Sequence, residues 1–256
     1  MFKNKGLLNV FILTLASMSY SAQAIPIPVD LSTWQSDGDG TWNLQPGNNT
    51  VLQSKNGDPT VFFNSGSNAQ GTQISGSIKV GNTTDDDFIG FVLGYQDNEL
   101  SSASSDFLLI DWKNQDQSLS GGVSGLDGLA ISKVNGIGDF NDFWGHTGAV
   151  TEIGRATNLG SIGWIENQEY LFDIVFTSSL VEVYVDNTLE ISITATDAGL
   201  ASFSDGAAGF YNLSQDNVLY AGITEQNLPS SSVPEPSTLA IFALGMIGLA
   251  SRRFKK

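Results

Sequence analysis

The chain has 256 residues, no cysteine and a formal net charge of −16. Without cysteine, disulfides contribute nothing to stability and the fold must rely on its core. The acidic charge excludes nucleic acid as a partner, and the single histidine excludes a metal centre built from several histidines.

The first 24 residues have the three parts of a secretory signal peptide. Lys3 and Lys5 form a basic start, an apolar stretch follows, and Ala22-Gln23-Ala24 is a small-x-small cleavage site that ends at Ala24. We therefore expect an exported protein whose mature chain starts at Ile25.

The middle of the chain is more acidic than the whole. Setting aside the six basic residues of the two terminal segments and Glu235 leaves five basic and 26 acidic residues in residues 25–233, a net charge of −21. Such a surface repels nucleic acid and anionic polymers, and divalent cations partly neutralise it. The length suffices for one β domain with its own core, which we expect at residues 25–228.

The motif Asp37-Gly38-Asp39-Gly40 is the first candidate metal loop along the chain. It lacks the later bidentate acid of an EF-hand loop, so the pattern favours a turn over a metal site.

Alternation of apolar and polar residues predicts most of the strands. The clearest patterns cover residues 74–80, 170–176, 181–185 and 189–193, with further candidates at 207–212 and 218–224. Asp186-Asn187, between two of these segments, predicts a tight hairpin. Glycine and small polar residues at 120–128 and 135–142 predict connections, and no long amphipathic helical pattern lies between the terminal signals.

Two nearly continuous apolar runs, at residues 88–95 and 107–112, predict strands buried between two sheets. Asp85, Asp86 and Asp87 stand at the start of the first run. Three adjacent carboxylates must be solvated, protonated or held by a cation, and calcium with oxygen ligands is the natural candidate. Asp97 and Asp106, from neighbouring loops, are candidate further ligands. The alternative is a solvated, charged strand end that discourages edge pairing.

Trp144 and His146 are the candidate ligand-binding residues. Trp144 lies in a glycine-rich loop and is the tryptophan we expect to meet a sugar ring if one is exposed, although most tryptophans of a sandwich fill its core. A catalytic triad would depend on His146 alone, and no nucleophile elbow accompanies it, so a structural role in this loop is favoured.

Glycoside hydrolysis requires a pair of carboxylates. Glu182 and Asp186 share one face of a predicted strand, but four residues of strand span about 13 Å. A retaining enzyme needs about 5 Å between its two carboxyl groups. We therefore expect a protein that is not an enzyme.

The last residues contain Val233-Pro234-Glu235-Pro236, an apolar segment at 237–251 and a basic end at 252–256 that includes Arg252 and Arg253. Its first fourteen residues, 237–250, would reach roughly 21 Å as a helix, against about 30 Å of hydrocarbon, so the segment is a marginal transmembrane helix. An ordinary membrane anchor is one interpretation. The three elements in this order resemble the PEP-CTERM signal of Gram-negative bacteria. That resemblance implies transient membrane contact, processing by an exosortase-type protease, and sorting of the exported protein to the cell surface or exopolysaccharide matrix. Residues 229–256 are then a tether and a sorting signal.

A second resemblance covers most of the middle. Its landmarks are Trp42, Asn56-Gly57-Asp58-Pro59, Asp85 to Gln96, Phe107 to Lys113, Trp144 to Gly148, Ile162-Gly163-Trp164 and Gly209 to Gln215. In this order they resemble the C-terminal lectin-like domain of thrombospondins.

This resemblance implies an all-β, concanavalin-like (L-type lectin-like) jelly-roll sandwich that binds calcium through acidic loops. It also implies adhesion and matrix contact outside cells rather than catalysis. The family's acidic run corresponds to Asp85, Asp86 and Asp87. Gly145, inserted between Trp144 and His146, departs from the family pattern.

The sequence thus predicts an exported, calcium-dependent, lectin-like binding protein whose partner is an extracellular polysaccharide or surface glycan. A structural matrix protein without a sugar site and a glycoside hydrolase of the same fold are the alternatives.

Overall fold

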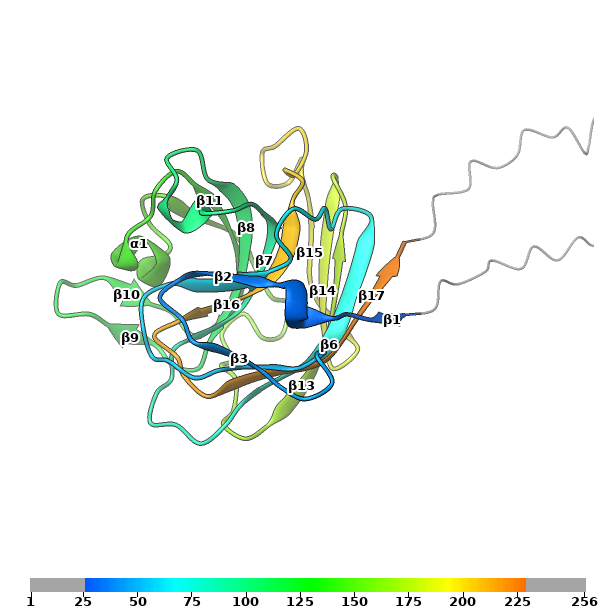
Figure 1. Ribbon diagram of the computed structural model, residues 1–256. Helices are drawn as coiled ribbons and strands as arrows, with labels where there is room; N and C mark the ends of the chain where they lie inside the picture. Colours follow the sequence, from blue (N-terminus) through cyan, green and yellow to red (C-terminus); the bar gives the residue numbers. More distant parts are fainter. Residues whose placement is uncertain (1–25, 229–256) are drawn as a thin grey trace, which may run out of the picture.

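The computed structural model describes residues 26–228 (Figure 1). The predicted signal peptide with Ala24, and the predicted sorting tail with Val233 to Pro236 and Arg252 and Arg253, lie outside the described residues. Within residues 26–228, no helix is both long and apolar enough to cross a bilayer.

Two antiparallel sheets form the molecule. The first sheet has eight strands in the order β15-β14-β13-β6-β17-β4-β3, with β1 paired to β17. Its strands are β1 (Ile27–Pro28), β3 (Trp42–Leu44), β4 (Val51–Gln53), β6 (Thr72–Val80), β13 (Glu169–Phe176), β14 (Leu180–Val185), β15 (Thr188–Thr194) and β17 (Val218–Asn227).

The second sheet has seven strands in the order β12-β11-β8-β7-β16-β5-β2. Its strands are β2 (Gln35–Gly38), β5 (Thr60–Phe63), β7 (Phe88–Tyr95), β8 (Asp106–Lys113), β11 (Gly128–Asn135), β12 (Val150–Arg155) and β16 (Ala207–Leu213). The remaining elements are the hairpin β9 (Gln117–Ser118) and β10 (Ser124–Gly125), helix α1 (Phe140–Gly145), and two 3-10 turns, η1 (Leu31–Thr33) and η2 (Glu99–Ser101).

The strands predicted from alternation are confirmed. Along β13, Tyr170, Phe172, Ile174 and Phe176 are buried while the residues between them are more exposed. The predicted hairpin joins β14 to β15 through Asp186 and Asn187, with φ of 49° and 64°. Two successive left-handed residues match the twist of the paired strands, which explains the Asp-Asn sequence there.

The main core lies between the two sheets. It takes Ile89, Phe91 and Leu93 from β7 and the alternate residues of the first sheet, such as Phe172 and Ile174. The ring centroids of Phe91 and Phe172 are 4.5 Å apart across this layer. The all-β, lectin-like sandwich expected from the sequence is therefore confirmed.

A second core covers the outer face of the second sheet. It takes Phe88 and Val92 from the other side of β7 and packs them with Leu109 of β8 and with Phe143 and Trp144 of α1. Strand β7 is buried along its full length because it has a core on each face. This arrangement explains the continuous apolar run, since a strand covered on both faces cannot alternate with polar residues.

Strand β10 lies within the predicted connection at 120–128, helix α1 starts within the one at 135–142 and runs past it, and β9 precedes the first connection. Asp139 caps α1 by accepting a hydrogen bond from the Asp142 N–H at 3.0 Å, and the Asp142 side chain in turn accepts one from the Asp139 N–H. His146 ends the helix in the left-handed conformation, with φ of 49°. These short elements form the lid of the second core.

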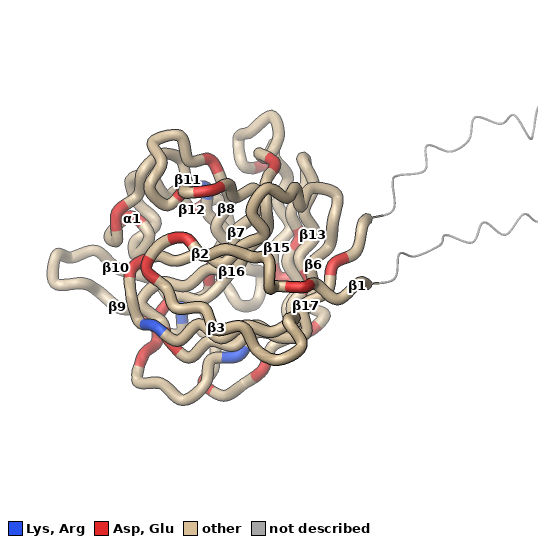
Figure 2. Tube along the Cα trace, viewed as in Figure 1, with Lys and Arg blue, Asp and Glu red and all other residues tan. Residues whose placement is uncertain are grey.

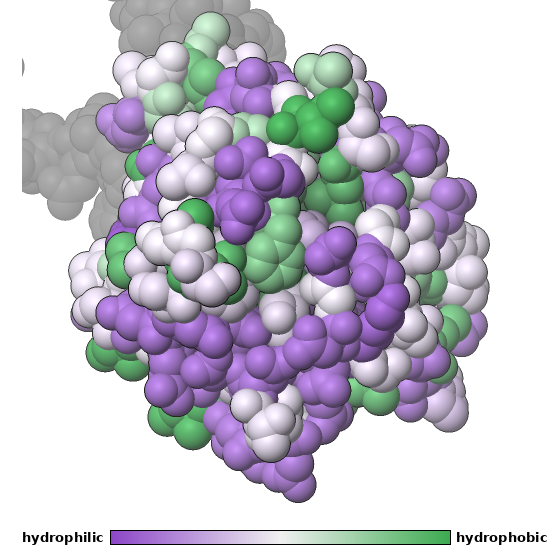
Figure 3. Space-filling view, turned by 90° about the vertical axis from the view of Figure 1, so that its left-hand side faces the viewer, coloured by the Kyte–Doolittle hydropathy of each residue, from purple (hydrophilic) through white to green (hydrophobic). Residues whose placement is uncertain are grey.

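Acidic residues lie on many loops around the sandwich, and few basic residues interrupt them (Figure 2). The face that carries α1 and the hairpin β9–β10 is mostly hydrophilic, with apolar residues in separate small groups (Figure 3).

Candidate metal centre

Asp85, Asp86 and Asp87 directly precede β7, at the end of the sandwich where β8 finishes. One carboxylate oxygen from each lies within 4.8 Å of the others. Asp87 is buried, whereas Asp85 and Asp86 are partly exposed. The cluster predicted from the sequence therefore forms in space, with one member inside the protein and two at its surface.

Three neighbouring segments hold Asp87 in place. Its N–H donates to Gln215 Oε1 at 2.9 Å, and its carbonyl accepts a hydrogen bond from Trp164 Nε1 at 3.0 Å. Its carboxylate Oδ1 lies 2.5 Å from the Lys113 ammonium. Asp87 is thus a buried carboxylate with a dedicated counter-ion.

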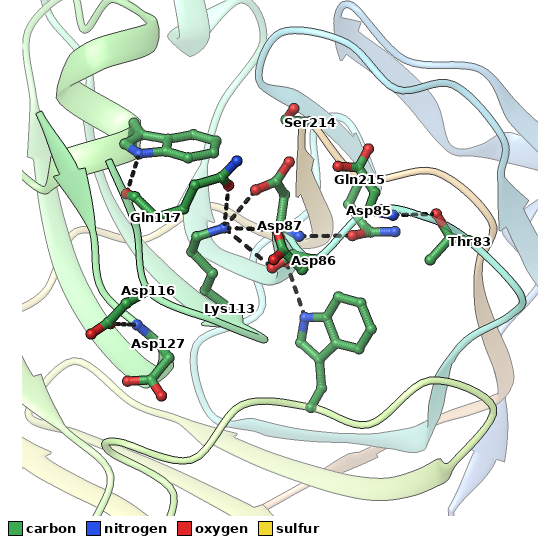
Figure 4. A network of polar contacts seen from close by, with 12 residues as sticks. Thr83, Asp85, Asp86, Asp87, Lys113, Asp116, Gln117, Asp127, Ser214 and Gln215 are labelled. Atoms are coloured by element: carbon green, nitrogen blue, oxygen red, sulfur yellow. Dashed lines mark hydrogen bonds and ion pairs between the residues drawn. The ribbon is translucent and has the colours of Figure 1, made fainter. Parts of the chain in front are cut away.

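Lys113, the last residue of β8, is fully buried and provides that counter-ion (Figure 4). Its ammonium also donates to the Asp86 carbonyl and to Gln117 Oε1, each at 3.2 Å. The ammonium lies 4.6 Å from the centroid of the Trp144 ring, within cation–π range. These contacts compensate the burial of the charge and leave Lys113 little freedom to serve another carboxylate.

Asp85 has a less favourable environment. Burial, contact with Asp87 and the negative charges of Asp216 and Asp86 raise its pKa to about 7. The Asn56 side chain donates a hydrogen bond to the Asp85 carboxylate. The Asp85 N–H donates to Thr83 Oγ1 at 3.1 Å. The cluster therefore holds more negative charge than its contacts neutralise.

The donor set suits a hard divalent cation. Asp85 and Asp86 offer partly exposed carboxylate oxygens, and the Asp86 carboxylate is 3.6 Å from Lys113, a looser contact than that of Asp87. Asp216 lies near enough to raise the pKa of Asp85. The Asp216 carboxylate accepts a hydrogen bond from Thr83 Oγ1 at 3.0 Å. Calcium prefers such a set of carboxylate and carbonyl oxygens.

Asp97 and Asp106 do not join the cluster. Asp97 follows the end of β7, and Asp106 begins β8. The eight residues of β7 carry the chain roughly 25 Å away from Asp87. Asp97 accepts a hydrogen bond from Ser65 at 2.7 Å, and Asp106 pairs with Lys133 at 3.1 Å. The prediction that they add ligands beside Asp85 is wrong, because a buried strand separates its two ends.

Trp144 is buried, and the His146 side chain is largely covered, with 9% of it exposed. Trp144 is 2% exposed, and its Nε1 donates to the Gln117 carbonyl at 3.3 Å. It faces the Lys113 ammonium and packs edge-on against Phe88, with ring centroids 5.6 Å apart. The placement of Trp144 therefore corrects the expectation of an exposed sugar platform.

His146 ties α1 to the second sheet. Its Nε2 is 2.9 Å from an Asp111 carboxylate oxygen, and its Nδ1 is 3.3 Å from Glu152. Burial opposes the charged ring, but the Asp111 and Glu152 carboxylates outweigh burial and raise the pKa of His146 to about 10. The structural reading of His146 fits this geometry, and a role in contacting ligand does not.

The Asp37 to Gly40 motif has partners from the protein itself. The Tyr95 hydroxyl donates to Asp37 at 2.5 Å, and Asp39 forms an ion pair with Lys55. Asp37 and Gly38 end strand β2, and Asp39 and Gly40 lie in the connection to β3, so the favoured turn covers only the second half of the motif.

Sequence reasoning missed the contributions of Asn56, Lys113, Gln215 and Asp216 to the centre. Asn56 and Gln215 belong to two landmark segments of the thrombospondin resemblance. In the structure both segments meet the third landmark at Asp85 to Asp87. The presence of polar side chains in all three landmark segments was the sequence signal that could have indicated one shared centre.

The two sheets, the short lid and the acidic end define a lectin-like β-sandwich. Residues 37–227 match the family described as "Thrombospondin C-terminal region", and residues 232–256 match the "PEP-CTERM protein-sorting motif". The chain belongs to the thrombospondin C-terminal family.

Two curated relatives illustrate the match. Thrombospondin-3b of Danio rerio is 26% identical over 202 residues, which cover 72% of this chain and 20% of that protein. Thrombospondin-3 of Homo sapiens is 26% identical over 212 residues, which cover 77% of this chain and 21% of that protein. The aligned region thus spans about a fifth of these relatives.

Solved structures show the same fold. The carbohydrate binding module CBM66 from Bacillus subtilis has a TM-score of 0.51 at 12% identity, covering 76% of this chain and 95% of that chain. The exoplasmic/lumenal domain of VIP36, in a Ca²⁺/Man-bound form, has a TM-score of 0.50 at 13% identity, covering 78% of this chain and 85% of that chain. At these identities the likeness concerns the fold alone.

Proposed function

We propose that this protein is a non-catalytic, calcium-stabilised glycan-binding protein of the cell surface or extracellular matrix. Its binding domain is residues 25–228, with residues 1–24 removed on export. Calcium is held by Asp85 and Asp86, with Asp216 and Asn56 beside them. Calcium fixes the loops at this end of the sandwich.

One observation carries the calcium assignment. Three carboxylates lie within 4.8 Å, and the buried ammonium that faces them makes its shortest contact with Asp87. The pKa of Asp85 is raised to about 7 by burial and by its acidic neighbours, so at neutral pH a divalent cation relieves the repulsion. Asp87 pairs with Lys113 and has a structural role. The partly exposed carboxylates of Asp85 and Asp86 then bind the ion.

The glycan assignment rests on fold relatives whose printed names state carbohydrate binding, together with a sorting motif at residues 232–256. In this proposal an exosortase-type protease of a Gram-negative cell processes the tail after a transient stay in the membrane. The partner is then an extracellular polysaccharide or a surface glycan.

A glycan array tests the proposal. The domain of residues 26–228 contains every described strand and both cores, so it can be probed without its terminal signals. We expect glycan binding in millimolar calcium that weakens in EGTA and in the double variant Asp85→Asn and Asp86→Asn. An array without hits in either condition would instead favour a purely structural matrix protein.

A further inference from the structure

A cleft opens at the end of the sandwich opposite the acidic cluster. Its volume is about 480 Å³, and its lining includes Gly66, Ser67, Asn68, Gln96, Asp97 and Asp205. This volume falls in the range of small-molecule sites, roughly 300–1,000 Å³. Three loops form it: β5–β6, β7–β8 and β15–β16.

The loops of the cleft are joined to one another. The Ala69 N–H donates to the Gly206 carbonyl at 2.8 Å, which links the first loop to the third. Gly206 packs so closely on the end of β7 that an added Cβ would lie 2.5 Å from the Gly94 carbonyl carbon. The Gln96 N–H donates to Glu99 Oε2 at 2.8 Å and closes the second loop. A cleft built this way is formed before any ligand arrives, which lowers the entropic cost of binding.

Side chains of the first loop orient the two carboxylates of the cleft. Ser65 Oγ donates to Asp97 Oδ1 at 2.7 Å, and Asn68 Nδ2 donates to Asp205 Oδ2 at 2.9 Å. Asn68 is itself fixed, because its Oδ1 accepts from the Gln70 N–H at 2.9 Å. A carboxylate has about four acceptor positions, so both keep free positions for a ligand.

The charge of the cleft selects the ligand class. Its lining carries two carboxylates and neither lysine nor arginine. Anionic sugars such as uronates are therefore repelled, and the −21 charge of residues 25–233 adds to that repulsion. The Tyr95 ring is buried and its hydroxyl is bonded to Asp37, so stacking on this aromatic ring is unavailable.

We propose that this cleft is the glycan subsite and that it binds hexosamine units with free amino groups. The ammonium of the sugar lies between Asp97 and Asp205, and neighbouring hydroxyls bond to the amides of Asn68 and Gln96. This inference rests on the proposed glycan binding and names its subsite and ligand class.

Calorimetry with soluble oligomers of unacetylated glucosamine tests the inference on residues 26–228. We expect binding that the double variant Asp97→Asn and Asp205→Asn weakens about tenfold or more, since charge-assisted hydrogen bonds are lost while the shape is kept. The matched control is Asp116→Asn with Asp127→Asn. It removes the same charge near β9 and β10, at the other end of the sandwich, and should leave affinity nearly unchanged.

A steric variant gives a second, independent test. Gly66 has φ of +72° and nothing within 4 Å of an added Cβ, and asparagine tolerates this conformation. Gly66→Asn should fold and place a side chain in the cleft, lowering affinity about tenfold. Gly122→Asn is its control, because Gly122 has φ of +84° and equal space in the hairpin β9–β10.

Four results would overturn the inference. Equal weakening by the two double variants would mean general attraction of a polycation to an acidic protein. A larger loss of glucosamine binding in EGTA, with the domain still folded, than in the double variant Asp97→Asn and Asp205→Asn would mean that calcium, rather than these carboxylates, holds the sugar. An array that finds other glycans but no glucosamine oligomer would refute this subsite assignment and leave the proposed function standing. No glycan binding of any kind would remove both.

Discussion

Asp85 is the member of the acidic cluster whose charged form is disfavoured by burial and by neighbouring carboxylates. Its pKa is raised to about 7 from an ordinary value of 3.8, first by burial and then by Asp87, Asp216 and Asp86. The stability that protonated Asp85 contributes is therefore complete below about pH 4 and is lost as the pH rises through about 7.

We expect Asp85→Asn to raise the melting temperature of the calcium-free domain at pH 8, because it removes an unfavourable charge. The same variant should lose most of the stabilisation by calcium. Differential scanning calorimetry in EGTA and in calcium measures both effects. Glu169→Gln, at an exposed acid of β13, is the control and should change neither quantity. A destabilised, calcium-free Asp85→Asn protein would contradict this assignment.

His146 gives a clean spectroscopic prediction, because it is the single histidine of the chain. Asp111 and Glu152 overcome the effect of burial and raise its pKa to about 10 from an ordinary 6.5. The stability contributed by the charged ring is then present below pH 6.5 and is lost as the pH rises through about 10. Nuclear magnetic resonance of the ring should show no titration between pH 5 and 8.5. A midpoint near 6.5 would refute the ion pair.

At the residue scale, the sequence predicts where the charged side chains cluster better than it predicts which residues they contact. Adjacent carboxylates at Asp85 to Asp87 are visible in the sequence, and they do cluster. Their counter-ion, Lys113, is not visible, because the contact depends on the register in which β7 pairs with β8. Asp97 was misassigned for a different reason: it is only ten residues from Asp87 along the chain, but the extended strand β7 between them makes the two distant in space.

At the element scale, Lys113 links β8 to the lid of the second core. Its ammonium joins Asp87, Gln117 of β9 and the Trp144 ring of α1. We expect Lys113→Met to destabilise the domain by about 3–5 kcal/mol, because it leaves a buried carboxylate unpaired. Urea unfolding measures the loss, and hydrogen exchange should show the greatest deprotection in α1.

Two variants test the explanation of that loss. Adding Asp87→Asn to Lys113→Met should recover part of the stability, since the unpaired charge is then gone. Lys133→Met breaks a partly exposed pair with Asp106 and should cost less than about 1 kcal/mol. Equal costs for Lys113→Met and Lys133→Met would show that Lys113 has no special role in the lid.

The strands were predictable for one of two reasons. Apolar and polar residues alternate along the strand, as in β13, or the whole strand is apolar, as in β7. Helix α1 was not predictable as a helix, because six residues are too few to establish a 3.6-residue period. Missing α1 meant missing the second core. It also explains why Trp144 was expected in an open loop.

At the scale of the whole molecule, the sandwich has two chemically different ends. One end holds the carboxylate cluster with its internal ammonium, and the other holds an open cleft with oriented carboxylates. The strands that connect them are buried on both faces at β7 and nearly so at β8. In our account the ion stabilises the domain at one end while the glycan binds at the other.

The most direct test of the account is the thermal unfolding of residues 26–228 in EGTA and in millimolar calcium. Calcium at about a hundred times its dissociation constant should stabilise the domain by about 2.7 kcal/mol and raise the melting temperature by roughly 5–10 °C. The double variant Asp85→Asn and Asp86→Asn should show no such rise. Identical melting curves for the unaltered domain with and without calcium would contradict the proposed calcium centre.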